Sequence, residues 1–317
     1  MVEPNVFYKR IKAKDIPAAV MSESAVFNNV LAPASIRRVY DALRSQGYLL
    51  QRVTLSNFTK YILSPEVDLF RELHLVRKSD GKDVIRLIPR SQPVSPYAIA
   101  LSLSTHAYVS HYSALYLHGL TLNVPKPIYV KSRRTKAKNP PREPGSLTQA
   151  QLDSSFSLPA RATRNIYTFD YEGATREVYL LEKSAEVDKG ITKVFAPHAP
   201  SGIAVSGIEK TLVECVIKTN YAGGAGEVLD AFRMAKGNLK ILRMMQLFNG
   251  GHYLFPYEKN ILFYMDRTDY SEQQKNLVKE RSRPDRKGFT TYLEKDMHSM
   301  RLDPEIGIYY PQGLESE

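Results

Sequence analysis

The stretch GIAVSGIEKTLVECVIKTNYAGGAGEVLDAFRMAKG, Gly202–Gly237, decides the fold because it holds two complete helices and the turn between them. Ser206 followed by Glu209 predicts a capping box at the start of the first helix. Its apolar residues recur at helical spacing, so one face must be buried: Ile208, Leu212, Val213, Val216 and Ile217. The turn Asn220–Gly224 follows, and a second apolar helix runs to the stop signal at Gly237. The pattern predicts a helical hairpin at the centre of a domain.

Three other stretches accompany this hairpin in a fixed order. They are YVSHYSALYLHGLT at Tyr108–Thr121, FSLPARATRNIYTF at Phe156–Phe169 and FPYEKNILFYMDRTDY at Phe255–Tyr270. Together with the hairpin, they make the C-terminal two thirds of the chain resemble the AbiE-type antitoxins of type IV toxin-antitoxin systems, which act in abortive infection and phage defence.

The resemblance implies a transcriptional regulator of two parts. Such antitoxins repress their own operon by binding inverted repeats in its promoter DNA. They also neutralise a nucleotidyltransferase toxin encoded beside them, typically without a stable complex. The resemblance assigns the antitoxin activity to the larger C-terminal part. This chain departs from the family in its first 30 residues, which form a longer N-terminal extension than expected.

Length and composition agree with a folded two-domain protein that binds polyanions. A chain of 317 residues exceeds what one hydrophobic core usually organises. Apolar residues make up 43% and charged residues 24%, which excludes a disordered class. The net charge of +11 favours a nucleic-acid partner through counterion release. We expect an α+β chain with a domain boundary between residues 95 and 96.

The sequence also indicates the cellular compartment of the protein. The single cysteine, Cys215, lies on an apolar helix face and indicates a core residue in a reducing cytosol. No apolar run reaches the ~18 residues that a membrane span needs. We therefore expect a cytoplasmic protein without a membrane partner.

Residues 1–95 predict a winged helix-turn-helix, with the first 30 residues as an extension of unassigned role. Helices are expected at 36–44, 55–63 and 66–73. Two extended runs at 74–78 and 83–89 surround Asp80-Gly81, which is typical of a hairpin turn. The recognition helix is either 65–73, by its place before the hairpin, or 36–44, by its arginines.

Basic residues of this region and of a later loop are the candidate DNA contacts. The loop, 131–146, is basic and Pro-rich, and is either a nucleic-acid arm or only a solvated loop. The full candidate set is Arg37, Arg38, Arg44, Lys60, Arg71, Arg77, Lys78, Lys82, Arg86, Arg133, Arg134, Lys136 and Lys138. An operator with inverted repeats requires two protein copies, so the chain is a monomer in solution or a dimer on DNA.

Residues 96–317 predict a larger mixed α/β domain without a catalytic, metal or cofactor signature. Strands are expected in PIYV, NIYTF, REVYLLE, ITKVFAP, GIAVS and IGIYYP, and helices at 97–103, 110–118, 239–248 and 257–265. Asn238 is expected to cap the helix at 239–248.

Several residues carry side chains that could take part in catalysis or binding. His106, His111 and His118 are interpreted as ordinary helix residues because no metal-ligand spacing accompanies them. The glycines of 220–226 follow a helix and lack a Gly-Lys-Ser/Thr ending, so they match no nucleotide-binding fingerprint. Tyr221 in that loop could be an exposed contact. We expect no enzyme. The alternatives are a metal-dependent nuclease using Asp170 and Glu177, with Glu182 and Lys183 nearby, or a protein-binding module without DNA.

Overall fold

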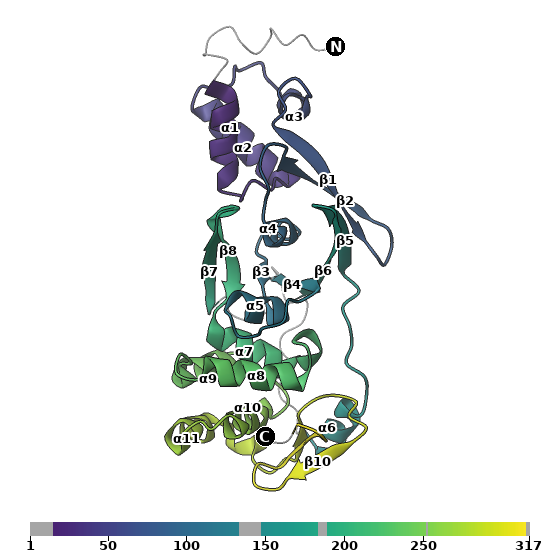
Figure 1. The fold of residues 1–317 in the computed structure, drawn as a ribbon, viewed down its shortest axis with the longest axis vertical. Helices are drawn as coiled ribbons and strands as arrows, with labels where there is room; N and C mark the ends of the chain where they lie inside the picture. Colours follow the sequence, from purple (N-terminus) through teal and green to yellow (C-terminus); the bar gives the residue numbers. More distant parts are fainter. Residues whose placement is uncertain (1–14, 133–146, 183–188, 252, 315–317) are drawn as a thin grey trace. The chain divides into compact units, whose positions relative to one another are not determined.

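The computed structural model describes residues 15–132, 147–182, 189–251 and 253–314 (Figure 1). The chain divides into two compact units that are discontinuous in sequence. The first contains residues 1–107, 164–180 and 193–204, and the second contains 108–163, 181–192 and 205–317. This division differs from the expected boundary at residue 95, because later strands pair with the N-terminal hairpin and belong to the first unit. Helices and strands occur in both units, which confirms the α+β class.

The first unit begins with three helices and a hairpin. These are α1 Asp15–Ala25, α2 Pro33–Ser45, α3 Leu55–Leu63, β1 Phe70–Arg77 and β2 Asp83–Pro89. β1 and β2 are antiparallel, with Phe70 opposite Pro89. A single antiparallel bridge, Leu31 to Leu87, ties the segment between α1 and α2 to the hairpin. The apolar faces of the three helices enclose one core, which includes Val20, Leu43 and Phe58.

The rest of the first unit extends this hairpin into a sheet. It contains α4 Pro96–Leu101, β5 Ile166–Tyr171, most of β6 Ala174–Glu182, and most of the strands β7 Ile191–Ala196 and β8 Ala199–Ser206. β5 pairs antiparallel with both β1 and β6. The β7–β8 hairpin is attached to the N-terminal helices, since Asn28 donates from Nδ2 to the Gly202 carbonyl at 3.0 Å.

The second unit is mainly helical. Its elements are β3 Tyr108–Val109, α5 His111–Leu117, β4 Pro127–Ser132, α6 Gln149–Phe156, α7 Ile208–Ile217, η2 Thr219–Tyr221, α8 Ala225–Ala235, α9 Ile241–Asn249, α10 Tyr257–Arg267, α11 Glu272–Arg281, η3 Pro284–Arg286, β9 Thr291–Tyr292, β10 Met300–Asp303 and β11 Ile308–Pro311. β3 pairs antiparallel with β4 and parallel with the end of β8. β11 pairs antiparallel with β10 and parallel with β9.

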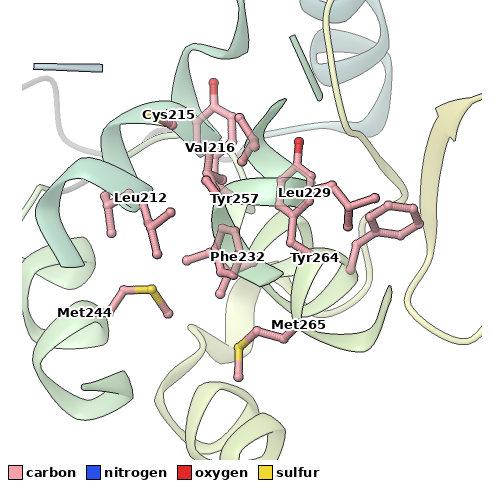
Figure 2. Packing of buried hydrophobic residues seen from close by; sticks show 14 of the residues in the cluster. Leu212, Cys215, Val216, Leu229, Phe232, Met244, Tyr257, Tyr264 and Met265 are labelled. Carbon is pink, nitrogen blue, oxygen red and sulfur yellow. The ribbon is translucent and has the colours of Figure 1, made fainter. Parts of the chain in front are cut away.

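The core of the second unit is built around the predicted helical hairpin α7–α8. Figure 2 shows Leu212, Cys215 and Val216 of α7 gathered with Phe232 of α8 and Tyr264 of α10. The rings of Phe232 and Tyr264 stack with their centroids 5.3 Å apart. Cys215 is fully buried and has a free thiol, as expected for a core residue.

The reversal between α7 and α8 depends on glycine. Gly223 and Gly224 have φ angles of +85° and +96°, a region that side chains other than glycine rarely adopt. A Cβ on Gly223 would lie 2.7 Å from the Glu227 side chain. Tyr221 is buried in this turn and accepts the Thr163 N–H at 2.8 Å, so the suggestion of an exposed contact residue is wrong.

Three expectations about helices are wrong. The helix expected at 66–73 is absent: a turn covers 65–67, Asp68 has a φ of +53°, and β1 begins at Phe70. Pairing with β2 places Leu73 and Leu75 in the core at a strand spacing, and this tertiary packing overrides the helical pattern. Ser206 forms no capping box with Glu209.

Ser206 fails as a cap because it is the buried last residue of β8. Its Oγ bonds Thr211 Oγ1 at 2.8 Å, and Gly207 is the N-cap of α7. Asn238 is likewise not a cap, since α9 starts after Lys240. Finally, the charged stretch at 272–281 forms α11, and Gln149–Phe156 forms α6, neither of which was expected. Both begin with a capping box, at Ser271 and at Thr148.

Candidate nucleic-acid interface

Helix α3 presents a polar face next to the β1–β2 hairpin. It starts at Thr54, whose Oγ1 accepts the Asn57 N–H at 3.2 Å, and it buries Phe58, Tyr61 and Ile62. This leaves Ser56 and Lys60 exposed and Asn57 half-buried on the opposite side. Because these positions are separated by three and four residues, they lie on one face of the helix. The hydroxyl, amide and ammonium groups can hydrogen-bond bases or phosphates.

Aromatic packing fixes α3 against α2. The ring centroids of Tyr40 and Phe58 are 5.8 Å apart, and Tyr40 donates its hydroxyl hydrogen to the Val53 carbonyl at 2.7 Å. Arg44 donates to the same hydroxyl oxygen at 2.9 Å and to Gln51 Oε1 at 2.9 Å. Arg44 is therefore engaged in holding the α2–α3 connection, although its side chain is exposed.

The other arginines of α2 are available to a ligand. Arg37 and Arg38 are exposed, and among the described residues neither forms an ion pair. Pro33 at the start of α2 and the buried residues Val39, Tyr40 and Leu43 set the orientation of this face. The structure thus brings two free cations of α2 and Lys60 of α3 into the three-helix part of the first unit.

The hairpin carries five of the predicted basic residues, and two of them have acidic partners in the described chain. Arg77 pairs with Asp80, and Lys78 pairs with Glu177 of β6. His74 Nδ1 lies 2.6 Å from Asp83 Oδ2, and this hydrogen bond raises the pKa of the imidazole. Lys82 is exposed at the tip. Because Arg77 and Lys78 are paired with acids, the attraction of the hairpin for phosphate is weaker than its lysines and arginines suggest.

Arg86 is wrong as a DNA contact. Its side chain faces inward and the residue is only 7% exposed. Nε donates to Ser102 Oγ at 2.9 Å, and the terminal nitrogens donate to the carbonyls of Ser102 and Ile85, each at 2.8 Å. Burial lowers the pKa of this guanidinium. Arg71, on β1, is half-buried.

The basic loop is largely outside the described residues, including Arg133, Arg134, Lys136 and Lys138. Lys131, at the start of the loop, belongs to β4, and its ammonium group pairs with a buried carboxylate of the second unit. Its Nζ lies 3.1 Å from Glu214 Oε1. The loop as a nucleic-acid arm stays a prediction.

Lys131 belongs to a buried polar cluster centred on Glu214. Tyr108 donates to Glu214 Oε1 at 2.7 Å, and Lys210 Nζ lies 3.6 Å from the same oxygen. Burial acts to raise the pKa of this carboxyl, but the neighbouring cations, Lys131 first, lower it to about 2. Because one oxygen takes all these interactions, the cluster resembles a structural ion pair more than a catalytic centre.

His111 and His118 have structural positions, whereas His106 lies exposed in a turn outside any helix. His111 is 1% exposed, and burial lowers its pKa to about 3. Its Nδ1 lies 3.0 Å from Ser110 Oγ, and its ring packs edge-on against Tyr221. His118, at the end of α5, has Nε2 2.6 Å from the Ser206 carbonyl. Residues 15–132, 147–182, 189–251 and 253–314 contain no cluster of three or more His, Cys, Asp or Glu residues that could hold a metal.

The carboxylates of the alternative nuclease site are engaged separately. Asp170 on β5 accepts the Thr175 hydroxyl at 2.5 Å, and Glu177 on β6 pairs with Lys78. Lys183 and the side chain of Glu182 lie outside the described residues. No observation favours cleavage chemistry at this strand pair.

Ser56 and Asn57 on α3 are not among the residues predicted from the sequence. A usable signal was present, since Thr54 is a good N-cap and the helix it starts is followed by the two extended runs of the hairpin. The false helix at 66–73 hid this signal, because it moved the third helix one element too far along the chain.

Comparisons with known proteins support the fold. The structure is similar to the crystal structure of the RV2827C protein from Mycobacterium tuberculosis, with a TM-score of 0.52 and 13% sequence identity. The match covers 98% of this chain and 95% of that protein. No protein-family model matches the chain, and no curated protein is similar to it. None of the described helices is long and apolar enough to cross a membrane.

Proposed function

We propose that this chain is an autorepressing antitoxin of the AbiE type, whose first unit is a winged helix that binds promoter DNA. The observation that carries the DNA-binding part is the order of elements α1, bridge, α2, α3, β1 and β2. A winged helix has this order, with a short pairing after the first helix and a two-stranded wing after the third. The element before the wing is α3, which makes it the recognition helix in place of the two alternatives considered from the sequence.

The charges favour binding through the helices more than through the wing. Arg37, Arg38 and Lys60 are exposed cations, whereas Arg77 and Lys78 are paired with acids of the same unit. In this proposal Lys60 and the arginines contact phosphates, and Ser56 and Asn57 contact base edges in the major groove. Inverted repeats would be bound by two copies of the chain. Binding to promoter DNA places the protein in the cytoplasm.

Promoter binding tests the repressor part directly. Fluorescence anisotropy would compare a duplex from immediately upstream of the gene with a shuffled duplex of equal length, over a series of salt concentrations. We expect the upstream duplex to bind at least 100-fold more tightly, with affinity falling steeply as salt rises. Equal affinity for the two duplexes would remove the repressor claim.

The antitoxin part is tested in cells, independently of DNA. A nucleotidyltransferase encoded next to this gene would be expressed from one promoter and this protein from another, both unrelated to the native operon. We expect growth arrest by the transferase alone and recovery on co-expression, with no stable complex on size exclusion. Continued arrest despite equal expression of this protein would contradict the antitoxin assignment.

A further inference from the structure

The second unit contains a cavity of about 480 Å³, bordered by α10, α11, η3 and the turn before β11. Its size lies within the range of small-molecule sites. All of its lining residues belong to the second unit, and none belongs to the proposed DNA interface. Leu262 and Ile306 supply an apolar part of the wall, while the remaining lining residues are mostly charged.

Two buried charges line this cavity without being paired to each other. Glu258 is 3% exposed, and neither of its carboxylate oxygens has a hydrogen bond of normal geometry to the described residues. Arg286 is also 3% exposed, and its Nε approaches only Asp285, at 3.1 Å. Among the described residues, no ion pair within 4.0 Å joins Glu258 to Arg286. Burying charges in this way is costly unless a ligand or solvent completes their interactions.

The basic residues that line the cavity differ in their acidic partners. Lys275 is neutralised by Asp266 and Glu272. For Arg283, Arg286 and the exposed Lys287, the only acidic partner within ion-pair distance in the described chain is Asp285. Arg283 donates one N–H to the Phe255 carbonyl at 3.4 Å, and a guanidinium has further donors that suit a phosphate.

The Glu258 carboxyl needs a hydrogen-bond donor, which a simple anion such as phosphate does not supply. Burial raises the pKa of this carboxyl, and this shift is partly offset by the backbone N–H of Glu258 itself, by the charge and backbone N–H of Arg283 and by the charge of Arg286. A carboxyl group in this position is suited to hydrogen bonds with the amino-bearing edge of a nucleobase. The apolar side chains of Leu262 and Ile306 can then cover a ring.

We propose that this cavity binds a free mononucleotide whose base carries an exocyclic amino group. The phosphates lie at Arg283, Arg286 and Lys287, the amino edge lies at Glu258, and the ring lies against Leu262 and Ile306. This site is independent of the proposed DNA binding, and its test contains no DNA.

Isothermal titration calorimetry of the full chain tests the site with ATP, GTP, CTP, UTP and inorganic phosphate. Wild-type protein should bind at least one of the three amino-bearing nucleotides at least 10-fold more tightly than UTP, and inorganic phosphate more weakly still. Absence of binding at millimolar concentration for all nucleotides would overturn the proposal. Equal affinity for UTP and for every amino-bearing nucleotide would also overturn the proposal. Binding of inorganic phosphate without binding of any nucleotide would overturn it as well.

Two variants assign the roles of the residues. Lys287→Ala, at an exposed position, should weaken binding of every nucleotide at least 5-fold. Glu258→Gln, which keeps the shape of the side chain, should reduce the preference over UTP to less than 3-fold. The matched charge control is Lys236→Ala at the end of α8, which should leave all affinities unchanged. If Glu258→Gln, with its fold confirmed by circular dichroism, still prefers the amino-bearing nucleotide over UTP as wild type does, the assignment of the base to Glu258 is overturned.

Discussion

The ring of Tyr40 on α2 lies 5.8 Å from the ring of Phe58 on α3, and this contact joins the two helices of the proposed helix-turn-helix. Phe58 is fully buried, so Phe58→Ala should lower the free energy of unfolding by about 3–5 kcal/mol through lost transfer energy and cavity formation. Urea denaturation followed by circular dichroism measures the change. As a comparison, Tyr40→Phe keeps the ring and should cost only about 1–3 kcal/mol, because it leaves the Val53 carbonyl without its donor. Equal stability of Phe58→Ala and wild type would contradict this packing.

The paired charges of the β1–β2 hairpin, the proposed wing, give a prediction about salt dependence. Removing a phosphate contact changes the slope of log affinity against log salt by about 0.9. Lys60→Ala should therefore reduce the slope by about that amount, while Lys78→Ala, which breaks the pair with Glu177, should change it by much less. The measurement is DNA binding at four salt concentrations. A larger slope change for Lys78→Ala would show that the wing is the main phosphate contact.

Burial of His111 makes the second unit sensitive to acid. Its pKa is lowered to about 3 in the folded state, against about 6.5 when unfolded, so the unfolded chain binds a proton first as pH falls. The stabilisation is complete above pH 6.5 and declines below it, by about 2 kcal/mol between pH 7 and 5. His111→Asn tolerates the positive φ of this position and should remove that decline from the pH profile of unfolding. If the free energy of unfolding of the variant depends on pH as that of wild type does, groups other than His111 cause the acid sensitivity.

The Glu214 cluster should be a strong determinant of stability. Glu214→Gln leaves the ammonium groups of Lys131 and Lys210 without their carboxylate, and we expect a loss of about 3–5 kcal/mol. The control is Asp230→Asn, which removes an exposed partner of Arg233 and should change stability by about 0–1 kcal/mol. Thermal unfolding of both variants measures the difference. Similar midpoints for the two would contradict the structural role of the cluster.

The sequence was most informative where local signals and tertiary packing agree. The α7–α8 hairpin was predicted because its buried positions, such as Val228 and Phe232, follow helical spacing and Gly237 ends the second helix with a φ of +95°. The β1–β2 hairpin was predicted from Asp80-Gly81, since few other residue pairs suit that turn.

Other features depended on contacts between distant parts of the chain. Phe70–Leu73 has helical apolar spacing, but its pairing with β2 makes it a strand. The partners of Lys78 and Arg86 are separated from them by 99 and 16 residues, and no local pattern reveals them. For this reason the helix expected at 66–73 and the exposed position expected for Arg86 were wrong, while the DNA interface itself stays a prediction. The charged cavity near Glu258 could not be predicted, because its residues come from four separate elements.

The proposed recognition of promoter DNA by α3 is tested most directly by the preference for the upstream duplex over a shuffled one. Fluorescence anisotropy would give the ratio of affinities for the upstream and shuffled duplexes with wild type, the double variant Asn57→Ala/Lys60→Ala and the charge-matched control Lys236→Ala. We expect the double variant, with its fold intact, to lower this ratio at least 10-fold, while the control retains it. A double variant that keeps the wild-type ratio would show that α3 does not recognise the promoter sequence.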